Sequence, residues 1–87
     1  MITVHKYEIP IDQPCRLELP GGAKVVHTSS DFPGTVAAWI MHDLDNGTEA
    51  HHFRVVETGH PIEPDEIHVG AVGYGNRVLH LVLGVRW

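Results

Sequence analysis

Histidines are the residues of this chain whose side chains could do chemistry. Three of its eight histidines lie close together in the stretch EAHHFRVVETGHPI, residues 49–62. A catalytic zinc site needs about three converging ligands, and two of them often stand at i and i+2 of a strand or i and i+4 of a helix. The chain contains no H-x-H, and His51 and His52 are consecutive. Because consecutive side chains of a β-strand point to opposite faces, these two cannot share one ion. We expect no metal and no cofactor.

One arrangement would still bring histidines together. If Asn46 and Gly47 form a hairpin, His42 lies across from a residue near His51, which would allow a cross-strand pair. A third ligand would then come from one of three further histidines, His60, His68 or His80. A metal-dependent hydrolase built on such a set is the weakest of the functional hypotheses.

The turn TGHPI could instead hold His60 as a general base, since Gly59 and Pro61 would fix the backbone around it. A base needs a nucleophile or a substrate nearby, and the chain has no G-x-S-x-G elbow. Its single cysteine, Cys15, is interpreted as a small buried apolar residue. The glycine-rich stretch GAVGYG precedes a strand and does not open a helix, so it is no dinucleotide motif. We expect no catalytic residues.

Binding is the more plausible role for the polar residues. Imidazole and guanidinium groups can hold a phosphate and stack on bases. A C-terminal indole next to Arg86 either folds onto the domain or meets a partner. The candidate binding residues are His51, His52, Arg54, His60, Arg77 and Trp87.

Charge and composition exclude several classes of function. The net charge is −5 with neutral histidines, and the six basic residues are spread singly along the chain. Binding along a nucleic acid needs clustered Lys and Arg, because several phosphates must be neutralised at once. We therefore expect no extended nucleic-acid binding.

Cysteine usage and the apolar segments indicate the compartment. One cysteine allows no internal disulfide, which fits a reducing environment. The first residues show no charged leader followed by a long apolar run, and no apolar segment reaches the roughly 18 residues of a membrane span. We expect a cytoplasmic protein without membrane contact.

The elements that must position these residues are strands. Apolar and polar residues alternate with a period of two, and β-branched residues are frequent. The predicted strands cover residues 2–9, 15–19, 23–29, 34–43, 48–58, 67–74 and 77–85. Hairpin turns are predicted at 46–47 and 73–76. The sequence thus predicts one all-β domain over residues 1–87, a small sandwich or partly open barrel of about six to seven mostly antiparallel strands.

Three strands can be placed more closely. Residues 15–19 alternate apolar and charged side chains, which predicts one buried and one wet face. Residues 34–43 are apolar on both faces, which predicts a central strand with Trp39 in the core. The apolar stretch 77–85 is expected at a sheet edge, where unpaired backbone groups invite another strand. Because so short a chain buries a small core, we expect a homodimer.

The chain also resembles a family of small proteins of unknown function encoded by tailed bacteriophages and prophages. The matching segments are MITVHKYEIPIDQPCRLELPGGAKVVH, FRVVETGHPI, HVGAV and VLHLV. The resemblance implies a phage origin and action in a bacterial cytoplasm. With the size and the all-β pattern, it favours a non-enzymatic accessory protein that binds a host or phage protein. The alternative is an oligomer that sequesters a nucleotide-like small molecule.

Overall fold

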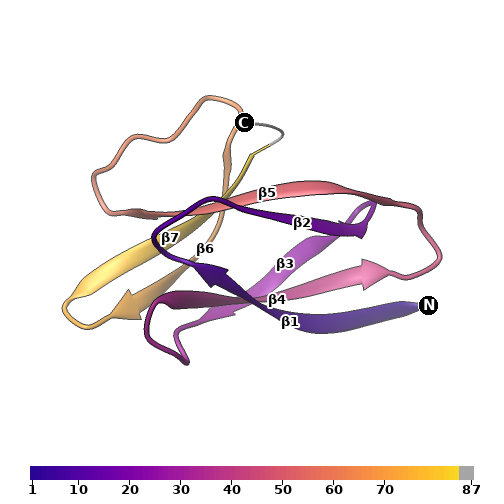
Figure 1. Cartoon of the computed structure of the whole chain (residues 1–87), viewed down its shortest axis with the longest axis horizontal. Coiled ribbons are helices and arrows are strands. Elements are labelled where there is room, and N and C mark those ends of the chain that lie inside the picture. Colours follow the sequence, from indigo (N-terminus) through magenta and orange to yellow (C-terminus); the bar gives the residue numbers. More distant parts are fainter. Residues whose placement is uncertain (85–87) are drawn as a thin grey trace.

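The computed structural model describes residues 1–84, which form seven β-strands and no helix (Figure 1). The strands are β1 (Ile2–Pro10), β2 (Cys15–Pro20), β3 (Lys24–Ser29), β4 (Thr35–Asp43), β5 (Thr48–Glu57), β6 (Ile67–Tyr74) and β7 (Arg77–Gly84). Within the described residues, the predicted strand boundaries are confirmed to within one residue.

The strands form two antiparallel sheets that stack as a sandwich, so the all-β prediction is confirmed and the barrel alternative is not realised. One sheet has the order β1-β4-β3, and the other has the order β2-β5-β7-β6. Figure 1 shows β2 and β5 running along one layer and β1 and β4 along the other. The layers touch where β3 meets β6, and there the Thr28 hydroxyl donates to the carbonyl of Ala71 at 3.0 Å.

The core lies between the inner faces of the two sheets. Alternation along each strand sends every second side chain inward. The main cluster of buried side chains is Ile9, Leu19, Ala38, Ile40, Phe53 and Leu81. A smaller cluster is formed by Val36, Val72 and Leu79. On β2, Leu19 is buried while Arg16 and Glu18 are exposed, which confirms the predicted wet face.

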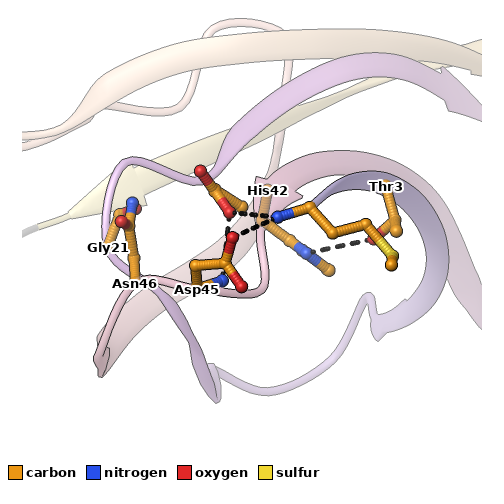
Figure 2. A network of polar contacts seen from close by, with 7 residues as sticks. Thr3, Gly21, His42, Asp45 and Asn46 are labelled. Carbon is orange, nitrogen blue, oxygen red and sulfur yellow. Dashed lines mark hydrogen bonds and ion pairs between the residues drawn. The ribbon is translucent and has the colours of Figure 1, made fainter.

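The hairpin predicted at Asn46-Gly47 is wrong. The chain does turn there, with the N–H of Asn46 donating to the carbonyl of Asp43 at 3.1 Å, but β4 and β5 belong to different sheets. Both edges of β4 are occupied by β1 and β3, so β5 must pair elsewhere. The turn bonds to Gly21 instead: the Asn46 side-chain amide donates to the Gly21 carbonyl at 2.8 Å (Figure 2). This contact lies next to the end of the β2–β5 ladder, where Pro20 pairs with Thr48.

The hairpin predicted at residues 73–76 is confirmed. Tyr74 pairs with Arg77 across a two-residue turn, and Gly75 has a φ of +62°, a conformation that glycine adopts without strain.

The expectation that residues 77–85 lie at a sheet edge is wrong for the described strand, because β7 runs between β5 and β6. Consecutive residues of β7 confirm its central position: Leu81 and Val82 are both 0% exposed, so both faces are covered. A continuous apolar run is typical of such a central strand.

The central position of β4 is confirmed, with β1 and β3 on either side. Its two faces are covered at Ala37 and Ala38, which are both 0% exposed. On the face of β4 that carries Ala37, the side chains toward the end of the strand are less covered. Trp39 is only half-buried and belongs to neither core cluster, and Met41 is 37% exposed. The expectation of a core Trp39 is therefore wrong, because no second layer packs over this face within residues 1–84.

Candidate functional site

The side of the three-stranded sheet that faces away from the four-stranded sheet carries the most distinctive surface. Residues directly opposite one another in paired strands share a face. The register gives three cross-strand rows on this side. They are Val4–Met41–Lys24, Lys6–Trp39–His27 and Glu8–Ala37–Ser29. We call these residues, together with Asp31 and Phe32 of the β3–β4 loop, the outer face.

Trp39 lies in the middle row of the outer face. Its indole N–H donates to the hydroxyl of Ser29 at 3.3 Å. The ammonium of Lys6 lies 5.4 Å from the ring centroid of Trp39 and 5.4 Å from that of Phe32, within cation–π range of both. The His27 ring lies 6.4 Å from the Trp39 ring on the other side. The indole is held in place while part of its surface remains open.

Ion pairs fix the loop side of the outer face. The Lys6 ammonium is 2.6 Å from a carboxylate oxygen of Asp31 and 3.3 Å from one of Glu8. The hydrogen bond to Asp31 is the main reason that the pKa of Lys6 is raised, and the same bond lowers the pKa of Asp31. The Thr35 hydroxyl also donates to Glu8, at 2.7 Å. The charges at the centre of the face thus compensate one another within the chain.

Apolar side chains surround this charged centre and remain in water. Val4 is 50% exposed and Phe32 58% exposed, next to the partly exposed Met41. Single exposed apolar residues are ordinary, whereas a group of them on one sheet face is the kind of surface that can be an interaction site. Lys24, at the end of the first row, makes no ion pair within the described residues.

His51 and His52 lie on opposite sides of β5, as predicted. His51 is 8% exposed, and its Nδ1 lies 3.0 Å from the carbonyl oxygen of Glu49. It pairs with Leu17, which packs on the core, whereas His52 pairs with the exposed Arg16 on the other side. His51 borders a groove of about 380 Å³ together with Glu49, whose carboxylate would repel a phosphate.

Arg54 holds a loop. Its guanidinium donates through Nε to Glu66 at 2.6 Å and through a second nitrogen to the other carboxylate oxygen. The Glu66 side chain is only 4% exposed. The pair raises the pKa of Arg54 and lowers that of Glu66, in each case mainly through this hydrogen bonding. A third contact, 3.4 Å to the carbonyl of Pro61, ties the β5–β6 loop to the sheet.

Two of the three remaining candidates, His60 and Arg77, lie at the end of β5. The backbone N–H of the exposed His60 donates to the carbonyl of Glu57, and the guanidinium of Arg77 pairs with the Glu57 carboxylate. Arg77 also lies 5.4 Å from the Tyr74 ring. Trp87 falls outside the described residues. The structure therefore brings His60 and Arg77 to one end of β5, and it separates His51 from His52 and Arg54.

The cross-strand pair of His42 and His51 is not formed, since the hairpin that would create it is absent. His42 is 3% exposed and lies opposite Thr3. The Thr3 hydroxyl is 3.5 Å from Nδ1 of His42. Figure 2 shows the two side chains pointing toward one another. Nε2 of His42 lies 3.2 Å from the hydroxyl of Tyr7, and the ring of His5 packs edge-on against the His42 ring at 4.9 Å. This is a buried histidine satisfied by β1.

His68 and His80 form a histidine pair that was not predicted from the sequence. Nε2 of His68 lies 3.0 Å from Nδ1 of His80, and Nε2 of His80 lies 2.8 Å from the hydroxyl of Thr58. Only the pairing of β6 with β7 brings the two rings together, and their spacing of twelve residues gives no local signal. Among residues 1–84, no group of three or more His, Cys, Asp or Glu is placed to hold a metal ion.

Fold and surface together define the class: a small two-layer antiparallel β-sandwich with one open aromatic sheet face. The chain belongs to a family described as a domain of unknown function, DUF7352, whose model matches residues 1–86. No curated protein and no solved structure matches the chain. Within the described residues, no helix is long and apolar enough to cross a membrane.

Proposed function

We propose that this protein is a non-enzymatic accessory protein that binds another protein through the outer face. The resemblance to phage and prophage proteins makes that partner a host or phage protein, met in the bacterial cytoplasm. The observation that carries the proposal is Trp39, a half-buried indole at the centre of a sheet face over which no second sheet packs within residues 1–84.

The composition of the outer face fits a protein interface. Tryptophan, phenylalanine and methionine are enriched where protein interfaces concentrate their binding energy. Trp39 and Lys6 are already positioned by their neighbours, so little side-chain freedom is lost when a partner covers them. Because Lys6 has its carboxylates within the same chain, burial by a partner leaves no unpaired charge at the centre.

The same residues specify the partner's chemistry. Val4, Met41 and Phe32 require an apolar patch opposite them. Lys24, which has no ion-pair partner in the described part of the chain, requires a carboxylate at the margin of that patch. We propose a protein partner whose surface combines these two features.

Two matched substitutions test the proposal. Met41→Glu places a carboxylate on the outer face, and Val78→Glu places one on the four-stranded sheet, where Val78 is 48% exposed. Immobilised wild-type protein and both variants are incubated with bacterial lysate, and retained proteins are identified and quantified. We expect a stoichiometric partner that Met41→Glu loses at least tenfold and Val78→Glu retains.

Three results would count against the proposal. They are the absence of any stoichiometric partner, equal retention by both variants, and loss by Val78→Glu alone. Circular dichroism of both variants shows beforehand that each keeps the sheet structure. Lys24→Glu serves as a second probe, and it should weaken binding less than Met41→Glu because a charge at the margin contributes less than a central apolar contact.

A further inference from the structure

We propose that β1 forms an antiparallel pair with β1 of a second copy of this chain. This inference is independent of the proposed function, since it concerns a strand edge and needs no other protein. Within the described residues, β1 pairs with β4 on one side only. Its other edge therefore presents backbone groups that are free to pair.

The backbone contacts at both ends of β1 show which groups point outward. The N–H of Leu44 donates to the carbonyl of Met1 at 2.8 Å, and the N–H of Ile11 donates to the carbonyl of Gly34 at 3.0 Å. Both bonds continue the register of β1 with β4. In an antiparallel strand, the backbone N–H and C=O groups of successive residues point alternately toward and away from the partner strand. The N–H and C=O groups of the odd-numbered residues of β1 therefore face β4. The groups on the free edge belong to Ile2, Val4, Lys6, Glu8 and Pro10.

Pro10 agrees with this assignment. Proline has no N–H, and in a sheet it stands where that group would face solvent. Pro10 falls on the free edge, so no bond to β4 is lost. The free edge thus offers four N–H donors, on Ile2, Val4, Lys6 and Glu8, and the proline marks where pairing must stop.

The other three edge strands are less suited to pairing. β2 and β3 contain six residues each, against nine in β1. The register of β3 is interrupted between Val25 and His27, and that of β6 between His68 and Gly70. Such bulges twist an edge away from further pairing. β3 and β6 also contact one another across the sandwich, through Thr28 and Ala71. The edge of β1 is the longest regular one.

One register makes the strand complementary to itself. With His5 opposite His5 of the second copy, Ile2 lies opposite Glu8, and Val4 lies opposite Lys6. All four N–H donors of each copy then find a carbonyl, and no like charges face one another. A shift by two residues in one direction places Lys6 opposite Lys6. A shift in the other direction leaves the N–H of Glu8 without a partner.

The pairing would also cover apolar surface. Ile2 is 68% exposed and Val4 is 50% exposed, both on the strand that would be joined. The product is a sheet of six strands in the order β3-β4-β1-β1-β4-β3. Because paired residues share a face, the two outer faces would become one continuous surface with two copies of Trp39.

Cysteine substitution tests the register directly. In a Cys15→Ala background, His5→Cys puts two thiols opposite one another at a non-hydrogen-bonded position, where Cα atoms are about 4.5 Å apart. That separation lies at the short end of disulfide geometry, roughly 4.4–6.8 Å. Thr3→Cys is the matched control, because Thr3 would lie opposite Tyr7 of the second copy. Mild oxidation should give a disulfide-linked dimer with His5→Cys at least tenfold faster than with Thr3→Cys. Equal rates would overturn the register.

Proline substitution tests the pairing without a cross-link. Val4→Pro removes an N–H donor from the free edge of β1, and Glu18→Pro is the matched change on the edge strand β2. The N–H of Gly21 donates to the carbonyl of Gly47, so the backbone groups of odd-numbered residues of β2 face β5. The N–H of Glu18 therefore points away from β5. Solution mass is measured by light scattering across concentrations up to about 1 mM, with circular dichroism reporting that each variant folds. Wild type and Glu18→Pro should approach twice the monomer mass, and folded Val4→Pro should stay monomeric. A monomeric wild type, or a dimeric Val4→Pro, would overturn the proposal.

Discussion

At the residue scale, one rule explains what could be predicted of the site. Because side chains alternate along a strand, His51 and His52 could be assigned to opposite faces from the sequence, and the structure confirms it. The partners of the polar residues could not be predicted in this way. Arg54 on β5 meets Glu66 at the end of the β5–β6 loop, and Lys6 on β1 meets Asp31 of the β3–β4 loop. Both contacts therefore depend on how distant segments fold together.

The pair of Arg54 and Glu66 leads to a prediction about acid stability. The pKa of Glu66 is lowered in the folded protein, so its contribution is complete above the ordinary pKa of a glutamate and is lost as the pH falls through the folded value. Glu66→Gln should lower the free energy of unfolding by about 2 kcal/mol at pH 7. The change removes the negative charge that both hydrogen bonds from Arg54 use, and it leaves one of them without an acceptor oxygen.

Urea denaturation measured between pH 7 and pH 2 tests this prediction. The free energies of unfolding of wild type and Glu66→Gln should converge at the acid end, where protonation makes the wild-type Glu66 side chain neutral, like that of Gln. Glu63→Gln is the control: Glu63 is exposed, and only its backbone N–H contacts Glu66, so this change should cost less than about 0.5 kcal/mol. A constant difference between wild type and Glu66→Gln at every pH would contradict the assigned role.

At the scale of elements, the strands could be predicted and their partners only in part. The period of two and the turn residues are local signals, which is why all strand positions and the hairpin at 73–76 were found. Which strand lies beside which is a non-local property. Asn46-Gly47 specifies a turn, but the occupied edges of β4 send β5 to the other sheet. The apolar stretch 77–85 was expected at a sheet edge, but its described part, β7, lies between β5 and β6. Its continuous apolar run is typical of such a central strand.

The contact between β3 and β6 leads to the second prediction, since Gly70 is the residue that lets these strands approach. A Cβ at Gly70 would lie 2.4 Å from the Thr28 methyl carbon and 2.8 Å from its hydroxyl oxygen. Gly70→Ala must therefore displace the Thr28 side chain or separate the two strands, and it should cost about 1–3 kcal/mol, as overpacking does. Gly73→Ala lies on the same strand with nothing within 4 Å of the added carbon.

Thermal unfolding of the two alanine variants separates packing from the general effect of replacing glycine. Gly70→Ala should lower Tm by about 4–24 °C, on the scale of about 4–8 °C per kcal/mol for a domain of this size. Gly73→Ala should change Tm by only a few degrees. Similar shifts in both variants would mean that β3 and β6 are not held together at this point.

At the scale of the whole molecule, the two sheets depend on one core. Ile9 and Ile40 come from the three-stranded sheet, Phe53 and Leu81 from the four-stranded sheet, and all four belong to the same cluster. A domain of this length buries only about 60% of the surface of its unfolded chain, so its stability has little reserve. Because the shared cluster contains side chains from both sheets, we expect neither sheet to persist when the other is lost.

This shared core leads to the third prediction, for which the two phenylalanines form a matched pair. Phe53 is 1% exposed and Phe32 is 58% exposed. Phe53→Leu should lower the free energy of unfolding by about 1 kcal/mol, and Phe53→Ala by about 3–5 kcal/mol, enough to unfold much of the protein. Phe32→Ala should change it by less than about 0.5 kcal/mol.

Residue-specific NMR through a urea titration of Phe53→Leu should show amides of β4 and β7 unfolding at one midpoint, because their strands pack on the same side chains. Separate midpoints would mean that the three-stranded sheet folds by itself.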